Sequence, residues 1–332
     1  MRQWVGDVEE ALRRRPFLHL GVHRLIGGVL TLFFVSILVF GATALLPGNA
    51  ARSILGPHAS HLQIVALDRQ LHLSGTLFSE YGSWLAGMLS GHLGTSLATG
   101  LPVGSVIRPE LLNSATLVVI SAVVSLTLSI GFGLLAAVKR DKTVDHASSL
   151  VALLLTAVPD FVLATVVIII FATLVFHLLP GVSTLTPGEY AWNDPRALVL
   201  PSLSLVLVTA PYPFRMTRAT LIEALESDYV EMARLKNVPE WRVVLQHALP
   251  NALAPVAQVG GLVIIYLAGG IVVIESVFTF PGIGQGLVNA VQRHDEPIVQ
   301  ATVLLLAAVY VIVNIGADVI ALALSPERRV AG

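Results

Sequence analysis

The sequence predicts an all-α integral membrane protein with about six transmembrane helices and both termini in the cytoplasm. Of its 332 residues, 55% are hydrophobic and only 12% are charged, whereas soluble domains carry about 25% charged residues. The mean hydropathy is +0.80. So few charges cannot cover a water-soluble particle of this size, and we therefore expect lipid to surround most of the surface.

Long gaps between charged residues show where membrane-spanning helices fit, because each helix needs about 20 mostly apolar residues. No charged residue lies between Arg24 and Arg52, or between Glu110 and Lys139. The later gaps are read in the same way. The predicted spans, in order, are 25–46, 113–138, 147–178, the segment between Arg196 and Arg215, 253–274 and 299–321.

The distribution of Lys and Arg over the loops sets the orientation, because cytoplasmic loops carry the excess. With the N-terminus inside, fifteen of the 20 Lys and Arg residues fall on the cytoplasmic side. The first apolar stretch exceeds the usual length of a cleaved signal core, so we expect it to be retained as a span. The predicted parts are a cytoplasmic N-terminal segment 1–24, a transmembrane helix 25–46, an extracytoplasmic loop 47–112, a transmembrane core 113–324 with an inserted cytoplasmic loop 215–252, and a cytoplasmic tail 325–332.

Asp160 is the one charged residue inside the third predicted span. If that helix starts near residue 147 on the cytoplasmic side, Asp160 lies about 20 Å into the membrane. An ionised carboxylate facing lipid there costs at least about 2.5 kcal/mol, so it should face a pathway or a partner subunit. Alternatively, Pro159 breaks the helix and Asp160 binds the freed N–H groups. We assign Pro159 and Asp160, with Glu275 at the end of the fifth span, to a translocation pathway.

The cytoplasmic loop contains a predicted helix–turn–helix. Asp228 followed by Glu231 fits a capping box at the start of a short helix. Asn237 lies where that helix should end in a left-handed residue, and Pro239 suits the first position of a second helix. The apolar stripe is short and the charges are mixed, which favours docking on another protein over lying among lipid headgroups. The stripe consists of Tyr229, Val230, Ala233 and Leu235.

This loop resembles the EAA loop of ABC importer permeases, whose pattern is E-A-A, three residues, G, nine residues, I, one residue, L-P. The matching positions here are Glu231-Met232-Ala233, Asn237, His247 and Leu249-Pro250. Glu, Ala, Leu and Pro are retained. Met232 replaces Ala, His247 replaces Ile, and Asn237 replaces Gly, which is a mild change at a left-handed position.

Other stretches are similar to the B-type permease subunit of dipeptide, oligopeptide and nickel importers, so the resemblance covers nearly the whole chain. It implies a permease that forms half of the pathway for di- or oligopeptides or a related small solute. The stretches are Leu45-Leu46-Pro47-Gly48, Gly91-His92-Leu93-Gly94-Thr95-Ser96, Asp228-Tyr229-Val230, Ile274-Glu275-Ser276-Val277-Phe278 and Phe280-Pro281-Gly282-Ile283-Gly284.

The resemblance also implies partners in a prokaryotic cell membrane. They are a second, homologous permease subunit, two ABC ATPase subunits and an extracytoplasmic solute-binding protein. ATP and Mg²⁺ are expected on the ATPases, because no lysine of this chain follows a glycine as a P-loop requires. The resemblance assigns ATPase docking to a coupling helix and its flanks, namely Asp228, Tyr229, Val230, Glu231, Ala233, Arg234, Asn237 and His247.

Two other classes of function are alternatives to an ABC permease. A secondary, ion-coupled carrier usually shows internal repeats and ionisable residues near the membrane midplane, where only Asp160 qualifies. An intramembrane enzyme needs paired catalytic groups, which the spans lack. No catalytic residue, resident cofactor, metal site or nucleic-acid partner is therefore predicted. The histidines of the outer loop are expected to be solvated rather than metal ligands; they are His58, His61 and His72, with Asp68 nearby.

Overall fold

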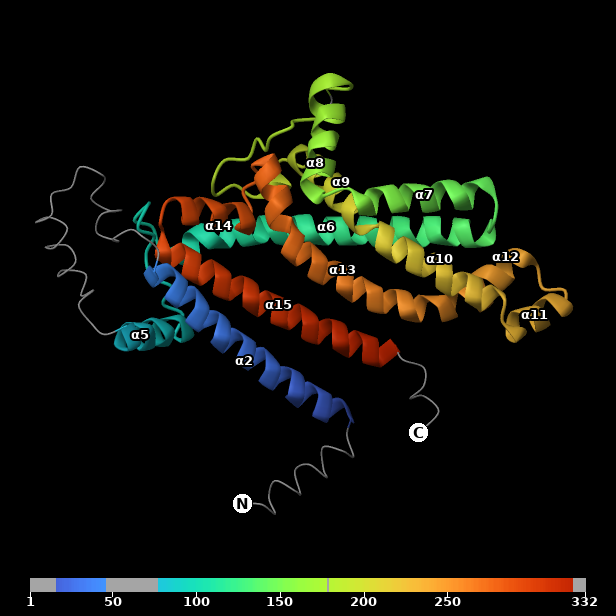
Figure 1. Ribbon diagram of the computed structural model, residues 1–332, viewed down its shortest axis with the longest axis horizontal. Helices are drawn as coiled ribbons and strands as arrows, with labels where there is room; N and C mark the ends of the chain where they lie inside the picture. The colour runs from blue at the N-terminus through green and yellow to red at the C-terminus, as the bar shows by residue number, and fades with distance from the viewer. Residues whose placement is uncertain (1–15, 46–76, 178, 325–332) are drawn as a thin grey trace, which may run out of the picture. The chain divides into compact units, whose positions relative to one another are not determined.

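The computed structural model describes residues 16–45, 77–177 and 179–324 (Figure 1). Most of the predicted segment 1–24, the first part of the outer loop with its three histidines and Asp68, and the tail 325–332 lie outside these residues. The described residues contain no strand, and one isolated bridge joins Thr95 to Pro102. The predicted all-α class is confirmed. Two compact units share the chain, unit 1 (1–107 and 289–315) and unit 2 (108–288 and 316–332).

Unit 1 contains α2 (Pro16–Leu45) and α5 (Leu77–Leu89), which lies in the predicted outer loop. The ring of Tyr81 packs edge-on against Phe40 at a centroid distance of 5.4 Å, and Trp84 lies 5.4 Å from the same ring. The Tyr81 hydroxyl also shares a 2.8 Å hydrogen bond with Ser36. These aromatic contacts hold α5 along the outer half of α2.

An acidic residue organises the turn that follows α5. Asp295 is buried and accepts hydrogen bonds from the Ser96 hydroxyl and from the N–H groups of Leu97 and Ala98, at 3.1 and 3.3 Å. Gly94 in the same segment has a positive φ of 80°, which glycine adopts without strain. The Gly91–Ser96 stretch singled out in the sequence therefore leads into a turn, Ser96–Ala98, whose donors all bind one carboxylate.

The remaining helices belong wholly or partly to unit 2. Three of the helices described are long and apolar enough to cross a membrane alone, and the number reaches six if each of three bent pairs is one span. The bounds are α6 (Val103–Val138), α7 (Thr143–Ala157), α8 (Asp160–Ile168) with a π-helical turn Ile169–Leu174, α9 (Arg196–Thr209), α10 (Pro211–Leu225), α11 (Asp228–Leu235), α12 (Glu240–Arg242), a π-helical segment Val243–Ala248, α13 (Leu249–Phe278), α14 (Ile283–Gln292) and α15 (Glu296–Leu324).

Several helix boundaries differ from the predicted ones. Helix α6 begins at Val103, ten residues before the predicted start at 113, because the charges at Arg108 and Glu110 do not end a helix even though they end an apolar stretch. The predicted continuous helix over 147–178 is wrong, because α7 and α8 meet at an angle of 109° (Figure 1). In the fourth gap, α9 and α10 form a pair bent by 44°, and α10 continues to Leu225 inside the predicted cytoplasmic loop.

Proline explains the break between α7 and α8. Pro159 has no N–H to donate and excludes the helical conformation from the residue before it. Val158 is accordingly extended, with φ −96° and ψ 131°, and Pro159 has φ −60° and ψ 146°. The chain then re-enters a helix at Asp160.

A row of small residues lets α6 approach its neighbours closely. Ser125 accepts a 2.9 Å hydrogen bond from Thr209 of α9, and Ser129 donates one to the carbonyl of Ala210. A Cβ on Gly133 would lie 2.7 Å from the Thr217 Cβ on α10. Small residues and interhelical hydrogen bonds are the usual means of helix packing in membranes. The row recurs every fourth position, at Ser121, Ser125, Ser129, Gly133 and Ala137.

Candidate functional site

Helix α11, in the loop predicted to be cytoplasmic, starts one residue earlier than the capping-box prediction requires. Ser227 is its N-cap, Asp228 is its first helical residue, and Glu231 is therefore the fourth. Ser227 makes no side-chain capping bond and donates instead to the carbonyl of Ala224. The predicted capping box is wrong, because Asp228 is already a helical residue and Glu231 is one position too far along the helix to pair with the N-cap.

The end of α11 follows the predicted left-handed turn. Asn237 has φ +58°. The Val238 N–H binds the carbonyl of Ala233 at 3.2 Å, and the Asn237 N–H binds that of Arg234 at 2.9 Å. These two bonds define a Schellman motif, which satisfies carbonyls at a helix end. Pro239 then caps α12 from the position before its first residue, Glu240.

Helix α11 has an inner and an outer face. Val230 and Ala233 are buried, at 0% and 7% exposed. They pack on the ends of other helices of unit 2, against Ala137, Leu221, Val243, Ala248 and Ala252. The outer face, which we call the docking face, consists of Tyr229, Met232 and Leu235, which are 44%, 53% and 75% exposed. Ala233 therefore fastens α11 to its own chain, and the docking face is what another protein can reach.

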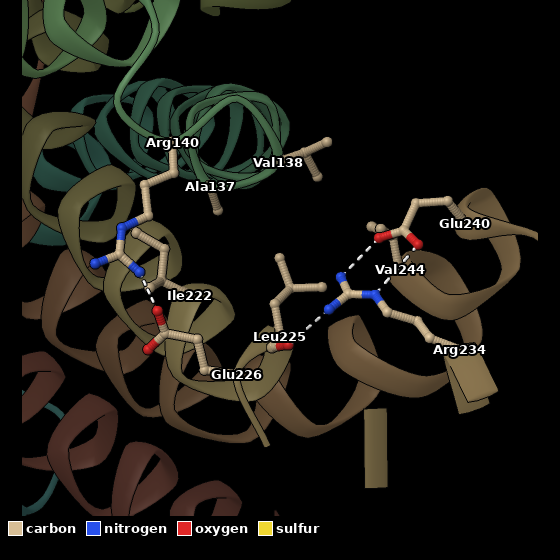
Figure 2. Close-up of a pocket in the computed structure, with 9 residues that line it drawn as sticks. All are labelled: Ala137, Val138, Arg140, Ile222, Leu225, Glu226, Arg234, Glu240 and Val244. Carbon is tan, nitrogen blue, oxygen red and sulfur yellow. Dashed lines mark hydrogen bonds and ion pairs between the residues drawn. The ribbon is translucent and has the colours of Figure 1, made fainter. Parts of the chain in front are cut away.

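A pocket of about 230 Å³ lies between α11 and the neighbouring helix ends (Figure 2). Figure 2 shows two Arg–Glu pairs at its edge, Arg140 with Glu226 and Arg234 with Glu240. The remaining lining residues are apolar and come from α6, α10 and the π-helical segment before α13; they are Ala137, Val138, Ile222, Leu225 and Val244.

Arg234 of α11 binds both the first residue of α12 and the last residue of α10. Its guanidinium donates to both carboxylate oxygens of Glu240, at 2.7 and 3.3 Å, and to the carbonyl of Leu225 at 3.3 Å. The hydrogen bonds from Arg234 lower the pKa of the Glu240 carboxyl below its ordinary value. The pair therefore remains charged at neutral pH and is lost only when acid protonates Glu240. His247, also assigned to docking, lies half-buried in the π-helical segment, where its carbonyl accepts a 3.0 Å bond from Asn251.

A buried ion pair that the sequence did not reveal connects α7 to α10. Asp145 is 2% exposed and accepts two hydrogen bonds from Arg218, at 2.5 and 2.7 Å. It also accepts one from the N–H of Asp141, whose φ is +61°. The two partners are 73 positions apart, so no local pattern relates them.

Asp160 lies at the first position of α8 and contacts a second bent helix. The hydroxyl of Tyr266 on α13 donates to its carboxylate, at 3.1 and 3.3 Å to the two oxygens. The carbonyl of Pro159 accepts the N–H groups of Val162 and Leu163. Asp160 thus makes a contact between helices, where the alternative interpretation gave it a capping bond within its own helix.

Glu275, near the C-terminal end of α13, is completely buried. Its carboxylate accepts hydrogen bonds from the Ser114 hydroxyl on α6 and from the N–H groups of Gly284 and Gln285, at 2.8 and 3.2 Å. The N–H groups belong to the first turn of α14, which favours a negative charge. A carboxylate so enclosed cannot touch a solute in this conformation. Its assignment to the pathway stays a prediction.

The glycines after Glu275 leave room for carboxylates. A Cβ on Gly282 would lie 2.0 Å from a Glu275 oxygen, and one on Gly286 would lie 2.1 Å from a Glu110 oxygen. On Gly284 a Cβ would lie 2.6 Å from the backbone of Val272. The Gly-x-Gly-x-Gly run is therefore required by close packing against Glu275, Val272 and Glu110.

The apolar helices and the exposed apolar face of α11 indicate the class of membrane transport subunits. Residues 129–330 match the family described as "Binding-protein-dependent transport system inner membrane component". The chain belongs to this family, and it is a permease subunit of an ABC importer of the peptide and nickel group in the bacterial cell membrane.

Individual relatives match along nearly their whole length. The glutathione transport system permease protein GsiC of Escherichia coli O6:H1 (strain CFT073) is 35% identical over 308 residues, which cover 93% of this chain and 98% of the relative. GsiC of Escherichia coli (strain K12) and GsiC of Shigella flexneri serotype 5b (strain 8401) are each 34% identical with the same coverage.

Substitution of Asn237 tests the left-handed turn. Asn237→Gly should leave stability and transport near wild type, because glycine adopts φ +58° freely. Asn237→Val should destabilise the turn by about 1–2 kcal/mol, since a β-branched residue resists this conformation. Thermal unfolding of the purified protein and ATP-driven uptake measure both effects. Equal behaviour of the two variants would remove the argument for the turn.

Substitution of Gly284 tests the packing around Glu275. Gly284→Ala should lower the stability of the purified protein by about 1–3 kcal/mol, because the new methyl group overlaps the backbone of α13. Gly131→Ala is the matched control, since a Cβ at this position on α6 meets nothing within 4 Å. Thermal unfolding in detergent compares them. A Gly284→Ala protein as stable as the control would show that the close approach is not required.

Proposed function

We propose that this chain forms half of the pathway of an importer for glutathione or short peptides, driven by two ATPase subunits that dock on α11. The observation that carries the proposal is the docking face. It presents three exposed apolar side chains on a helix whose other face is fastened to the core of unit 2. An exposed apolar patch on a rigid element is typical of a protein–protein contact.

The contacts around α11 give a route by which ATPase movement reaches the spans. Val230 and Ala233 pack on helix ends of α6 and α10 and on the segment that leads into α13. Arg218 on α10 is bound to Asp145 on α7. A displacement of α11 would therefore move α10, α13 and α7 together, because packed elements transmit strain. The breaks at Pro159 and within α13 are the places where such a displacement can change helix angles.

The other components follow from the family and from the chain's own chemistry. ATP and Mg²⁺ would bind to the ATPase subunits, which supply the P-loop that this sequence lacks. A second, homologous permease subunit would form the other half of the pathway. An extracytoplasmic binding protein would deliver the solute.

The solute assignment rests on relatives that transport glutathione by name. Glutathione is itself a small peptide, so the two solute classes share backbone amides, an ammonium group and carboxylates. In proteoliposomes that hold the complete importer, labelled glutathione or dialanine should accumulate only with ATP inside and the binding protein outside. Uptake that needs an ion gradient and no ATP would instead identify a secondary carrier.

Charge placed on the docking face should uncouple the ATPases. Met232→Asp should reduce co-purification of the ATPase subunits at least about tenfold while the protein still inserts and folds, because a charge buried in an interface costs several kcal/mol and at an open surface almost nothing. Pull-down with a tagged permease, together with thermal unfolding, measures both properties.

Two further variants complete this test. His146→Asp places the same charge at an exposed position in the first turn of α7, where helix N-termini favour it, and should keep the ATPases bound. Ala233→Asp should lower stability itself, because Ala233 is buried within the chain. Wild-type retention of ATPases by Met232→Asp would place the docking site elsewhere.

A further inference from the structure

Asp160 and Tyr266 form a polar pair between two broken helices. Asp160 opens α8 after the 109° break, and Tyr266 lies just before the 45° bend of α13 that separates Val259–Leu267 from Gly269–Phe278. The pair is accessible, since Asp160 is only partly buried and Tyr266 is 50% exposed. Discontinuous helices in transporters commonly border the solute site.

The charge of Asp160 has no cationic partner among the residues that the structure describes. The arginines that form ion pairs there bind Asp141, Asp145, Glu226 and Glu240. The Tyr266 hydroxyl offers a single proton, whereas a carboxylate can accept about four hydrogen bonds. Acceptor capacity and negative charge therefore remain on the side of Asp160 that Tyr266 does not cover.

A glycine of α13, Gly270, lies against this pair. A Cβ on Gly270 would lie 3.7 Å from an Asp160 oxygen and 3.6 Å from the Tyr266 ring. A Cβ on the adjacent Gly269 would meet nothing within 4 Å. The carboxylate and the phenol ring thus approach the α13 backbone at a position without a side chain, and a residue larger than alanine at 270 would press on both.

We propose that Asp160 and Tyr266 form a transient recognition site for the ammonium group of the solute during its passage. Asp160 accepts the ammonium N–H groups, and the exposed face of the Tyr266 ring contributes cation–π attraction. Tyr266 also holds the carboxylate in position through its hydroxyl. This inference rests on the proposed function, because it supposes a peptide-like solute with a free amino group.

Two variants distinguish ammonium recognition from a purely structural role, in which the hydrogen bond only fastens α8 to α13. Asp160→Asn keeps an acceptor for Tyr266 and removes the charge. Tyr266→Phe removes the hydrogen bond and keeps both charge and ring. A structural role predicts loss of stability in Tyr266→Phe and little change in Asp160→Asn, whereas ammonium recognition predicts the reverse order for uptake.

The experiment uses the complete importer in proteoliposomes with labelled glutathione and labelled dialanine. Asp160→Asn should lower uptake of both solutes about tenfold or more, as loss of one charged hydrogen bond predicts, while ATPase activity stimulated by the binding protein persists. Asp160→Glu should restore part of the uptake. Tyr266→Phe should stay within about threefold of wild type, and Glu223→Gln, which neutralises an exposed acid on α10, should match wild type.

A size series at Gly270 adds an independent measurement. Gly270→Ala should be tolerated, because its Cβ makes ordinary contacts, and Gly270→Leu should crowd the carboxylate and the Tyr266 ring and block uptake. Wild-type uptake in Asp160→Asn would overturn the inference, as would equal loss of stability in Asp160→Asn and Tyr266→Phe. If the wild-type importer moves neither solute, the proposed solute class fails first and the inference fails with it.

Discussion

The buried carboxylate of Glu275 is the interaction on which the packing of α14 against α6 and α13 depends. A charge removed from water and lipid headgroups must find several donors, and Glu275 finds them in Ser114 and in the first turn of α14. Ser114 in turn accepts the N–H of Ile283 at 2.8 Å. The carboxylate therefore fixes the position of α14 against α6 and α13 in a single network.

The neighbouring residue on α6 extends this network to a second loop. Asn113 is buried and donates to the carbonyls of Glu189 and Pro281, both at 2.9 Å, while its own oxygen accepts the N–H of Ala191 at 2.7 Å. Loops without regular hydrogen bonding are stable at a membrane boundary only when side chains satisfy their backbone groups. Two adjacent side chains on α6 do this for two loops that are far apart in sequence.

Sequence reasoning succeeded where the signal is local and failed where it is not. The all-α class follows from the spacing of charges, and the turn at Asn237 from the preference of asparagine for a left-handed residue. The 109° break is different, because Pro159 was recognised as a possible break while the apolar run continued through it. Apolarity fixes how much chain prefers lipid but does not require that chain to be straight.

The residue pairs that connect different helices could not be predicted from a single sequence, for a different reason. Asp145 and Arg218 are 73 positions apart, and Asp160 and Tyr266 are 106 apart. Nothing in either local segment specifies its partner, and only the packing of the helices brings the members together. For α11, helical spacing grouped four apolar residues into one stripe, but the structure divides them between two faces. Val230 and Ala233 are buried within the chain, and Tyr229 and Leu235 are exposed.

In unit 2 certain buried polar groups near helix ends are fully hydrogen-bonded, whereas the polar group at the helix break is not. At Glu275, Asn113 and Asp145 the polar groups are enclosed and bound to several donors, so their geometry is fixed. At Asp160 the carboxylate has one described donor, partial exposure and glycines beside it. A fully bound buried network resists change, whereas a sparsely bound group next to two helix breaks can exchange partners at small cost. The difference in hydrogen bonding therefore separates the parts that should move as rigid bodies from the place where the pathway can rearrange.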